Sequence, residues 1–178
     1  EIWRNWFVNK LDFYPISSPG LSKFGEFAVR HNHILVLLSS AKFTQPEVGQ
    51  FLRRYSEGVG DVAFRVQDLD TLVAHIQKVG ERLLHPIQSL VTAAGKLRWC
   101  RIRGWGSVYH TLIEHSETFA WGTDALAPSV TAADTSLAWR CVDHAVLNVP
   151  SGELSKAADW YVQVLGFTPQ QQFVIETP

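Results

Sequence analysis

The apolar residues of this chain recur with two spacings, and these spacings predict where helices and strands form. A recurrence every three to four residues predicts helices over residues 1–11, 46–55 and 68–79. Short apolar-rich segments bounded by turn residues predict strands over residues 26–30, 33–38, 58–66, 83–87, 97–102 and 108–114. The region 58–115 is therefore predicted to run strand, helix, strand, strand, strand.

A further apolar segment, residues 141–149, is almost unbroken, and Pro150 closes it. This pattern predicts a short buried strand. The residues after it predict a helix that starts at 151–154 and stops before Gly166, followed by an extended segment at 173–175. The order is that of the opening of another β-α-β unit.

Two pairs of segments indicate an internal repeat. Residues 5–15 and 159–169 share Trp, Val, Leu, Phe and Pro at a constant offset of 154 residues. Residues 60–64 resemble 142–146 at an offset of 82 residues. The chain is therefore predicted to be built from several β-α-β-β-β units, which is an α+β architecture.

The repeat also predicts how the chain is divided. We expect an N-terminal module over residues 1–115, a linker over 116–136 that is rich in Ala, Ser, Thr and Pro, and the start of a C-terminal module over 137–178. The offset of 82 places Val62 opposite His144, so the N-terminal module is predicted to have no metal site. By the same repeats, we expect the chain to be a piece of a larger protein, without a strand that precedes residue 1 and without strands that follow residue 178.

Composition excludes some classes of partner. The 178 residues carry a formal net charge of −1, and their basic residues are scattered, which argues against binding to nucleic acid or to a membrane surface. No apolar run is long enough to span a membrane. Both cysteines, Cys100 and Cys141, lie in apolar strand patterns, which favours a reducing, cytoplasmic setting over a disulfide framework.

His144 is the candidate metal ligand among the seven histidines. Its neighbour Asp143 is placed to orient the imidazole ring of a ligand. On the strand pattern alone, a buried histidine that is only hydrogen-bonded is the more common case. His110 and His115 fall on opposite faces of a predicted strand, so they do not converge on one ion. Glu114, at the end of that strand, is interpreted as structural or vestigial.

Several motifs together resemble the 4-hydroxyphenylpyruvate dioxygenase family, particularly its bacterial and cyanobacterial members. They are Asp-His-Ala-Val-Leu-Asn-Val-Pro at 143–150, the Asp-Trp-Tyr and Leu-Gly-Phe block at 159–167, Gly-Val-Gly-Asp-Val-Ala-Phe at 58–64, Pro-Ile-Gln at 86–88, and Gly-Trp-Gly with His-Thr-Leu-Ile-Glu at 104–114. The resemblance implies the vicinal-oxygen-chelate fold, in which tandem β-α-β-β-β modules form curved mixed sheets with helices on their outer face.

The resemblance also implies a site and a reaction. Fe(II) would be held by two histidines and a glutamate, with His144 as the first histidine and Val146 lining the substrate pocket. The remaining ligands would lie beyond residue 178, so the piece alone would be inactive. The family converts 4-hydroxyphenylpyruvate and O2 to homogentisate and CO2, in tyrosine catabolism and in the supply of quinone precursors. The implied partners are the 2-oxo acid, O2 and further copies of the protein in a dimer or tetramer.

Two alternatives stay open at this point. 4-Hydroxymandelate synthase resembles the family closely and uses the same substrate and iron, but it oxidises the benzylic carbon. A metal-free binding module of the same superfamily is the alternative from a different functional class.

Overall fold

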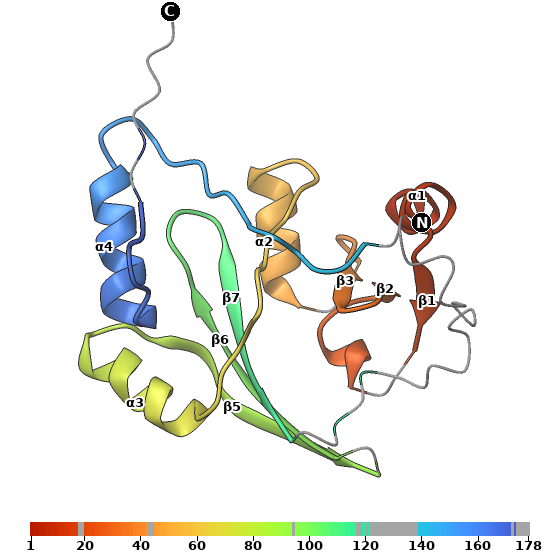
Figure 1. Ribbon diagram of the computed structural model, residues 1–178, viewed down its shortest axis with the longest axis horizontal. Coiled ribbons are helices and arrows are strands. Elements are labelled where there is room, and N and C mark those ends of the chain that lie inside the picture. The colour runs from red at the N-terminus through yellow and green to blue at the C-terminus, as the bar shows by residue number, and fades with distance from the viewer. Residues whose placement is uncertain are drawn as a thin grey trace, which may run out of the picture. The chain divides into compact units, whose positions relative to one another are not determined.

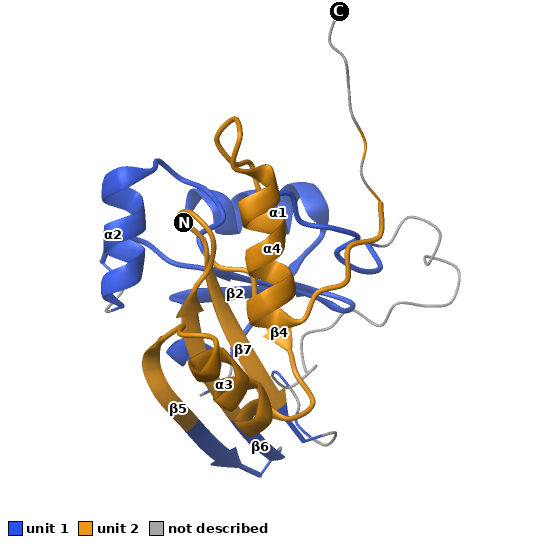
Figure 2. Ribbon diagram, turned by 90° about the vertical axis from the view of Figure 1, so that its left-hand side faces the viewer, with its two compact units in different colours: residues 1–60, 89–97, 115–146 blue, residues 61–88, 98–114, 147–178 orange. Residues whose placement is uncertain are grey.

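A computed structural model describes residues 1–17, 20–42, 45–93, 95–116, 119, 121, 139–171 and 173. The chain divides into two compact units, coloured separately in Figure 2. Unit 1 comprises residues 1–60, 89–97 and 115–146, and unit 2 comprises residues 61–88, 98–114 and 147–178.

Unit 1 begins with a helix followed by a small antiparallel sheet (Figure 1). The sheet has the order β1-β2-β3, with Val29 of β2 opposite both Pro15 and Val36. The predicted first helix, the hairpin and the helix that begins with proline are confirmed. The elements are α1 (Ile2–Leu11), β1 (Tyr14–Ile16), the short 3-10 helix η1 (Leu21–Lys23), β2 (Phe27–His31), β3 (Ile34–Leu38) and α2 (Pro46–Arg54).

The core of unit 1 explains why α1 and the hairpin form together. Phe13, Val29 and Ile34 are buried, and apolar side chains of α1 pack against them. The turn of the hairpin lies at residues 32–33, one residue later than predicted, with Asn32 at a φ of 50°. Asparagine tolerates this left-handed conformation, which residues with bulkier side chains disfavour.

Unit 2 contains the predicted order of strand, helix and three strands, which is confirmed. The sheet has the order β4-β7-β6-β5, and β4 runs parallel to β7 with Phe64 opposite Leu112. This is the pairing of a single β-α-β-β-β module, because the last strand returns to lie beside the first. The elements of this module are β4 (Phe64–Arg65), α3 (Leu69–Lys78), β5 (Leu83–Thr92), β6 (Gly95–Arg103) and β7 (Tyr109–His115), of which residues 89–97 and 115 are assigned to unit 1. Helix α4 (Leu154–Leu165) follows later in the chain.

The first strand of this module is shorter than predicted. Of residues 58–66, only Phe64–Arg65 form a regular strand, with an isolated parallel bridge between Asp61 and Tyr109. Backbone bonds from Val62 N to Tyr109 O (3.0 Å) and from Val66 N to Ile113 O (2.8 Å) continue the alignment on both sides. The segment is thus held along β7 over most of its length.

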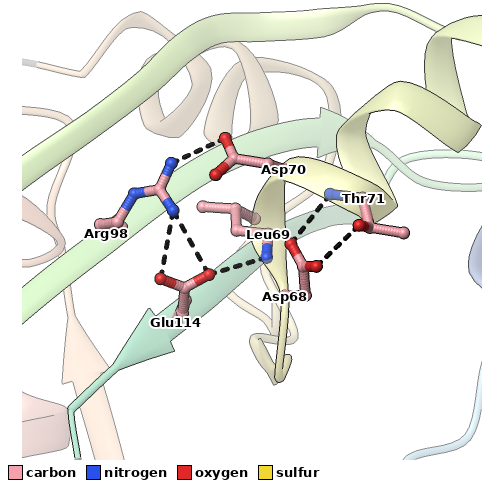
Figure 3. Close-up of polar contacts among 6 residues, drawn as sticks. All are labelled: Asp68, Leu69, Asp70, Thr71, Arg98 and Glu114. Carbon is pink, nitrogen blue, oxygen red and sulfur yellow. Dashed lines mark hydrogen bonds and ion pairs between the residues drawn. The ribbon is translucent and has the colours of Figure 1, made fainter.

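Helix α3 begins where the sequence predicts, because two carboxylates accept its first backbone N–H groups (Figure 3). Asp68 accepts from Thr71 N at 3.0 Å, as an N-cap does. Glu114, at the end of β7, accepts from Leu69 N at 2.8 Å and from Arg98 Nη1 at 3.2 Å. Glu114 therefore has the structural role that its position suggested: it ties β7 and β6 to the positive end of α3.

The core of unit 2 lies between its sheet and helices α3 and α4. Leu69 and Ile76 of α3 and Leu112 of β7 are fully buried, and Val164 of α4 lies in the same cluster. The apolar stripe predicted for α3 supplies much of this contact. No helix among the described residues is long and apolar enough to cross a membrane.

The prediction of a buried strand at 141–149 is wrong. These residues belong to no helix and no sheet, and the side chains of Val142 and Val146 are 66% and 76% exposed. A strand is stable only when a neighbour satisfies its backbone groups and covers its side chains, and no described strand pairs with this segment. Most of the predicted linker, and the extended segment predicted at 173–175 apart from Phe173, lie outside the described residues.

Candidate functional site

His144 lies on the exposed segment that precedes α4. Its Nδ1 donates to Asp143 Oδ2 at 2.6 Å, and the two side chains are 72% and 92% exposed. A carboxylate can only accept, so this contact fixes the proton on Nδ1 and leaves the lone pair of Nε2 for another partner. This is the arrangement of a metal-binding histidine oriented by a carboxylate.

A complete metal site is not assembled among the described residues. In them, no group of three or more His, Cys, Asp or Glu side chains converges. The role of His144 as a metal ligand therefore stays a prediction. Val146 lies two residues further along the exposed segment, and its role at the substrate stays a prediction.

A largely buried polar cluster in unit 2 joins Asp61, which precedes β4, to strands β6 and β7. Asp61 Oδ2 accepts from Thr111 Oγ1 at 2.7 Å and pairs with Arg101 Nε at 3.0 Å. Arg101 and Thr111 are both buried. Burial raises the pKa of Asp61, while the charge of Arg101 and the bonds from Thr111 oppose that rise. The cluster joins these three segments, and it offers no unengaged nucleophile or base.

His110 is the buried histidine that sequence reasoning did not single out. Its Nδ1 lies 2.9 Å from Val62 O and its Nε2 lies 2.9 Å from Tyr161 OH on α4. Its side chain is 2% exposed, and this burial lowers its pKa. The signal in the sequence was a histidine within an apolar-rich strand of the module, on the same strand face as Leu112.

One open pocket of about 380 Å³ lies on unit 2. The lining contains the glycine-rich turn between β6 and β7 and one residue of α4, and it includes neither His144 nor Val146. Trp160, which lines the pocket, donates its indole N–H to Glu81 at 2.8 Å.

The comparisons with known proteins define first the class of fold. A variant of 4-hydroxymandelate synthase from Streptomyces coelicolor superimposes with a TM-score of 0.70 at 17% identity, over 98% of this chain and 51% of that protein. No family model matches the sequence. The chain has the α+β fold of the vicinal-oxygen-chelate type, as predicted from its motifs.

The sequence comparisons then find relatives that share one name. The 4-hydroxyphenylpyruvate dioxygenase of Caenorhabditis elegans is 30% identical over 172 residues, and that of Danio rerio is 28% identical over 177 residues. Each match covers 91% of this chain and 44% of the relative. The chain is thus a homologue of the 4-hydroxyphenylpyruvate dioxygenases and spans less than half the length of these relatives.

Proposed function

We propose that the chain belongs to an Fe(II)-dependent dioxygenase that converts 4-hydroxyphenylpyruvate and O2 to homogentisate and CO2. The observation that carries the proposal is the homology to dioxygenases of this name along 91% of the chain. The superposition on 4-hydroxymandelate synthase supports the fold on which this chemistry takes place.

In this proposal, His144 supplies one neutral imidazole to the iron and Asp143 orients it. Bound Fe(II) supplies the redox chemistry with O2 and an anchor for the 2-oxo acid group of the substrate. The protein's part is to hold each donor in place and to exclude water from the reacting groups. Because one histidine cannot retain the ion alone, the other ligands come from the part of the protein that corresponds to the remaining length of the relatives.

The proposal also assigns the metal site to only one of the two predicted modules. Residues 1–115 form a module without a metal site, and residues 137–178 begin the module that holds the iron. Val146, in the same segment as His144, contacts the substrate. The whole protein acts in the cytoplasm as a dimer or tetramer.

4-Hydroxymandelate synthase is the second candidate, because the solved structure reported above is of that enzyme. Both reactions start from the same substrate and differ in the carbon that is oxidised. A metal-free binding module of the same fold is the third possibility and predicts that no iron is retained.

The test uses the whole polypeptide that the gene encodes. The protein is loaded with Fe(II), supplied with 4-hydroxyphenylpyruvate and O2, and its product is identified by mass spectrometry. Homogentisate supports the proposal, hydroxymandelate supports the second candidate, and a protein that retains no Fe(II) and takes up no oxygen supports the binding module.

A matched pair of variants tests the role of His144. His144→Ala should lose Fe(II) binding, whereas His33→Ala, at an exposed histidine on the turn between β2 and β3, should bind Fe(II) as the unmodified protein does. Unchanged iron affinity in His144→Ala would remove His144 from the ligand set.

A further inference from the structure

Helix α4 is held against the rest of unit 2 by three polar contacts in addition to its apolar side chains. Tyr161 OH lies 2.9 Å from His110 Nε2 on β7, and the Trp160 indole donates to Glu81 at 2.8 Å. His75 of α3 donates through Nε2 to the backbone carbonyl of Gln163 at 2.7 Å. The helix is thus fixed in rotation and in position along its axis, which apolar packing alone fixes less strictly.

The two hydrogen-bond partners of His110 determine which ring nitrogen donates and which accepts. Because the carbonyl of Val62 can only accept, Nδ1 carries the proton, and Nε2 of the neutral ring accepts from the Tyr161 hydroxyl. The imidazole lies near-parallel to the Trp160 indole, at an interplanar angle of 29° and a centroid distance of 6.2 Å. A Cβ at Gly104 would lie 2.6 Å from Nε2, so a larger residue in the turn after β6 would displace the ring.

The same helix is joined in the chain to the segment that carries His144. His144 stands ten residues before Leu154, the first residue of α4. Between them, a turn closed by a bond from Glu153 N to Pro150 O (3.1 Å) and a Gly152 φ of 82° leads directly into the helix. A shift or rotation of α4 therefore moves the end of the segment on which His144 lies.

We propose that His110 and Tyr161 are positioning residues for the iron site. Their hydrogen bond anchors α4 to β7, and α4 directly follows the segment that carries His144. This gives a role to the buried His110 and the half-buried Tyr161, which the proposed reaction does not otherwise use. The inference rests on the proposed function, because it assigns His144 to the iron.

The experiment measures metal binding separately from turnover. The whole protein is titrated with Co(II), whose visible absorption reports affinity and ligand geometry. Tyr161→Phe removes only the hydroxyl, and Tyr55→Phe is its control, because Tyr55 is exposed and lies at the end of α2, in unit 1. We expect Tyr161→Phe to weaken Co(II) binding about tenfold, the size typical of lost orienting contacts, and to alter the absorption bands, with an unchanged far-UV circular dichroism spectrum.

Two further variants make the result specific. His110→Gln keeps an acceptor for Tyr161 and should bind Co(II) more tightly than His110→Leu, which keeps none. Trp160→Phe removes a different bond of α4 and gives a second reading if Tyr161→Phe does not fold; its affinity should fall by a smaller factor.

The two proposals fail in different ways. Wild-type Co(II) affinity and absorption bands in folded Tyr161→Phe, or in folded Trp160→Phe if Tyr161→Phe does not fold, would overturn the positioning role. Wild-type affinity in His144→Ala would overturn the assignment of the ligand, whatever the Tyr161 variants show.

Discussion

Two segments of similar sequence have different structures in this protein. Residues 61–66 and 143–149 each begin with Asp, continue through apolar residues and lead into a helix. In the first, Asp61 is paired with Arg101 and the backbone is bonded to β7. In the second, Asp143 is 92% exposed and the segment joins no sheet. The comparison shows that an apolar run becomes a strand only where a partner strand lies beside it.

The largest expected difference between the two segments concerns the core. Leu112→Ala, at the strand paired with β4, removes a fully buried side chain and should lower the free energy of unfolding by about 3–5 kcal/mol. Val146→Ala, at a side chain that is 76% exposed, should change it by no more than about 0.5 kcal/mol. Urea denaturation measures both, and equal losses would show that residues 143–149 are buried in solution.

The two aspartates give the next largest difference. Asp61→Asn removes the carboxylate charge that pairs with the buried Arg101 guanidinium and should destabilise the fold by about 3 kcal/mol. Asp143→Asn removes an exposed charge and should leave stability unchanged. Thermal unfolding compares them, and a stable Asp61→Asn protein would mean that this ion pair is dispensable.

The N-termini of α3 and α4, the helices that follow the two segments, predict a smaller difference in stability. Asp68 caps α3 through Thr71 N, whereas Glu153 at the start of α4 makes no such side-chain bond. Asp68→Ala should therefore lower the melting temperature, by less than either core substitution, and Glu153→Ala should lower it less still. Calorimetry on the two variants is the measurement, and a reversed order would contradict the capping assignment.

The smallest expected effect is on the dependence of stability on pH. Burial lowers the pKa of His110 below its usual 6.5, while the bond to Val62 and the charge of Asp61 partly offset this. The unfolded chain therefore binds a proton at His110 more tightly than the folded chain does. The stability that neutral His110 contributes is complete above about pH 6.5 and is lost as the pH falls from there toward the lowered pKa.

The measurement is urea denaturation at several pH values between 5 and 8 (about the range over which histidine titrates). His110→Gln should flatten the fall in stability on the acid side. His33→Gln, at an exposed residue, should keep the wild-type slope, and an equal slope in the His110 variant would contradict the assignment.

Local pattern was sufficient for most of the fold. The start of α3 follows from Asp68, and the order of elements over 58–115 follows from spacing, because both depend on neighbours in the chain. For the candidate site, the motif at 143–150 identified His144 and Asp143, and the structure shows their hydrogen bond. The site could not be completed, because a metal site needs donors from several segments and the local pattern names only one.

The sequence by itself determined the β-α-β-β-β order, the capped helix and the resemblance that homologues confirm, because these are encoded in residues close together in the chain. Tertiary structure alone decided that residues 61–66 align with β7 while 141–149 join no sheet, and that His110 bonds Tyr161, 51 residues away. Periodicity reports which face of a segment is apolar. It does not report whether another segment is present to cover that face, and that contact determines burial, pairing and the protonation of a buried histidine.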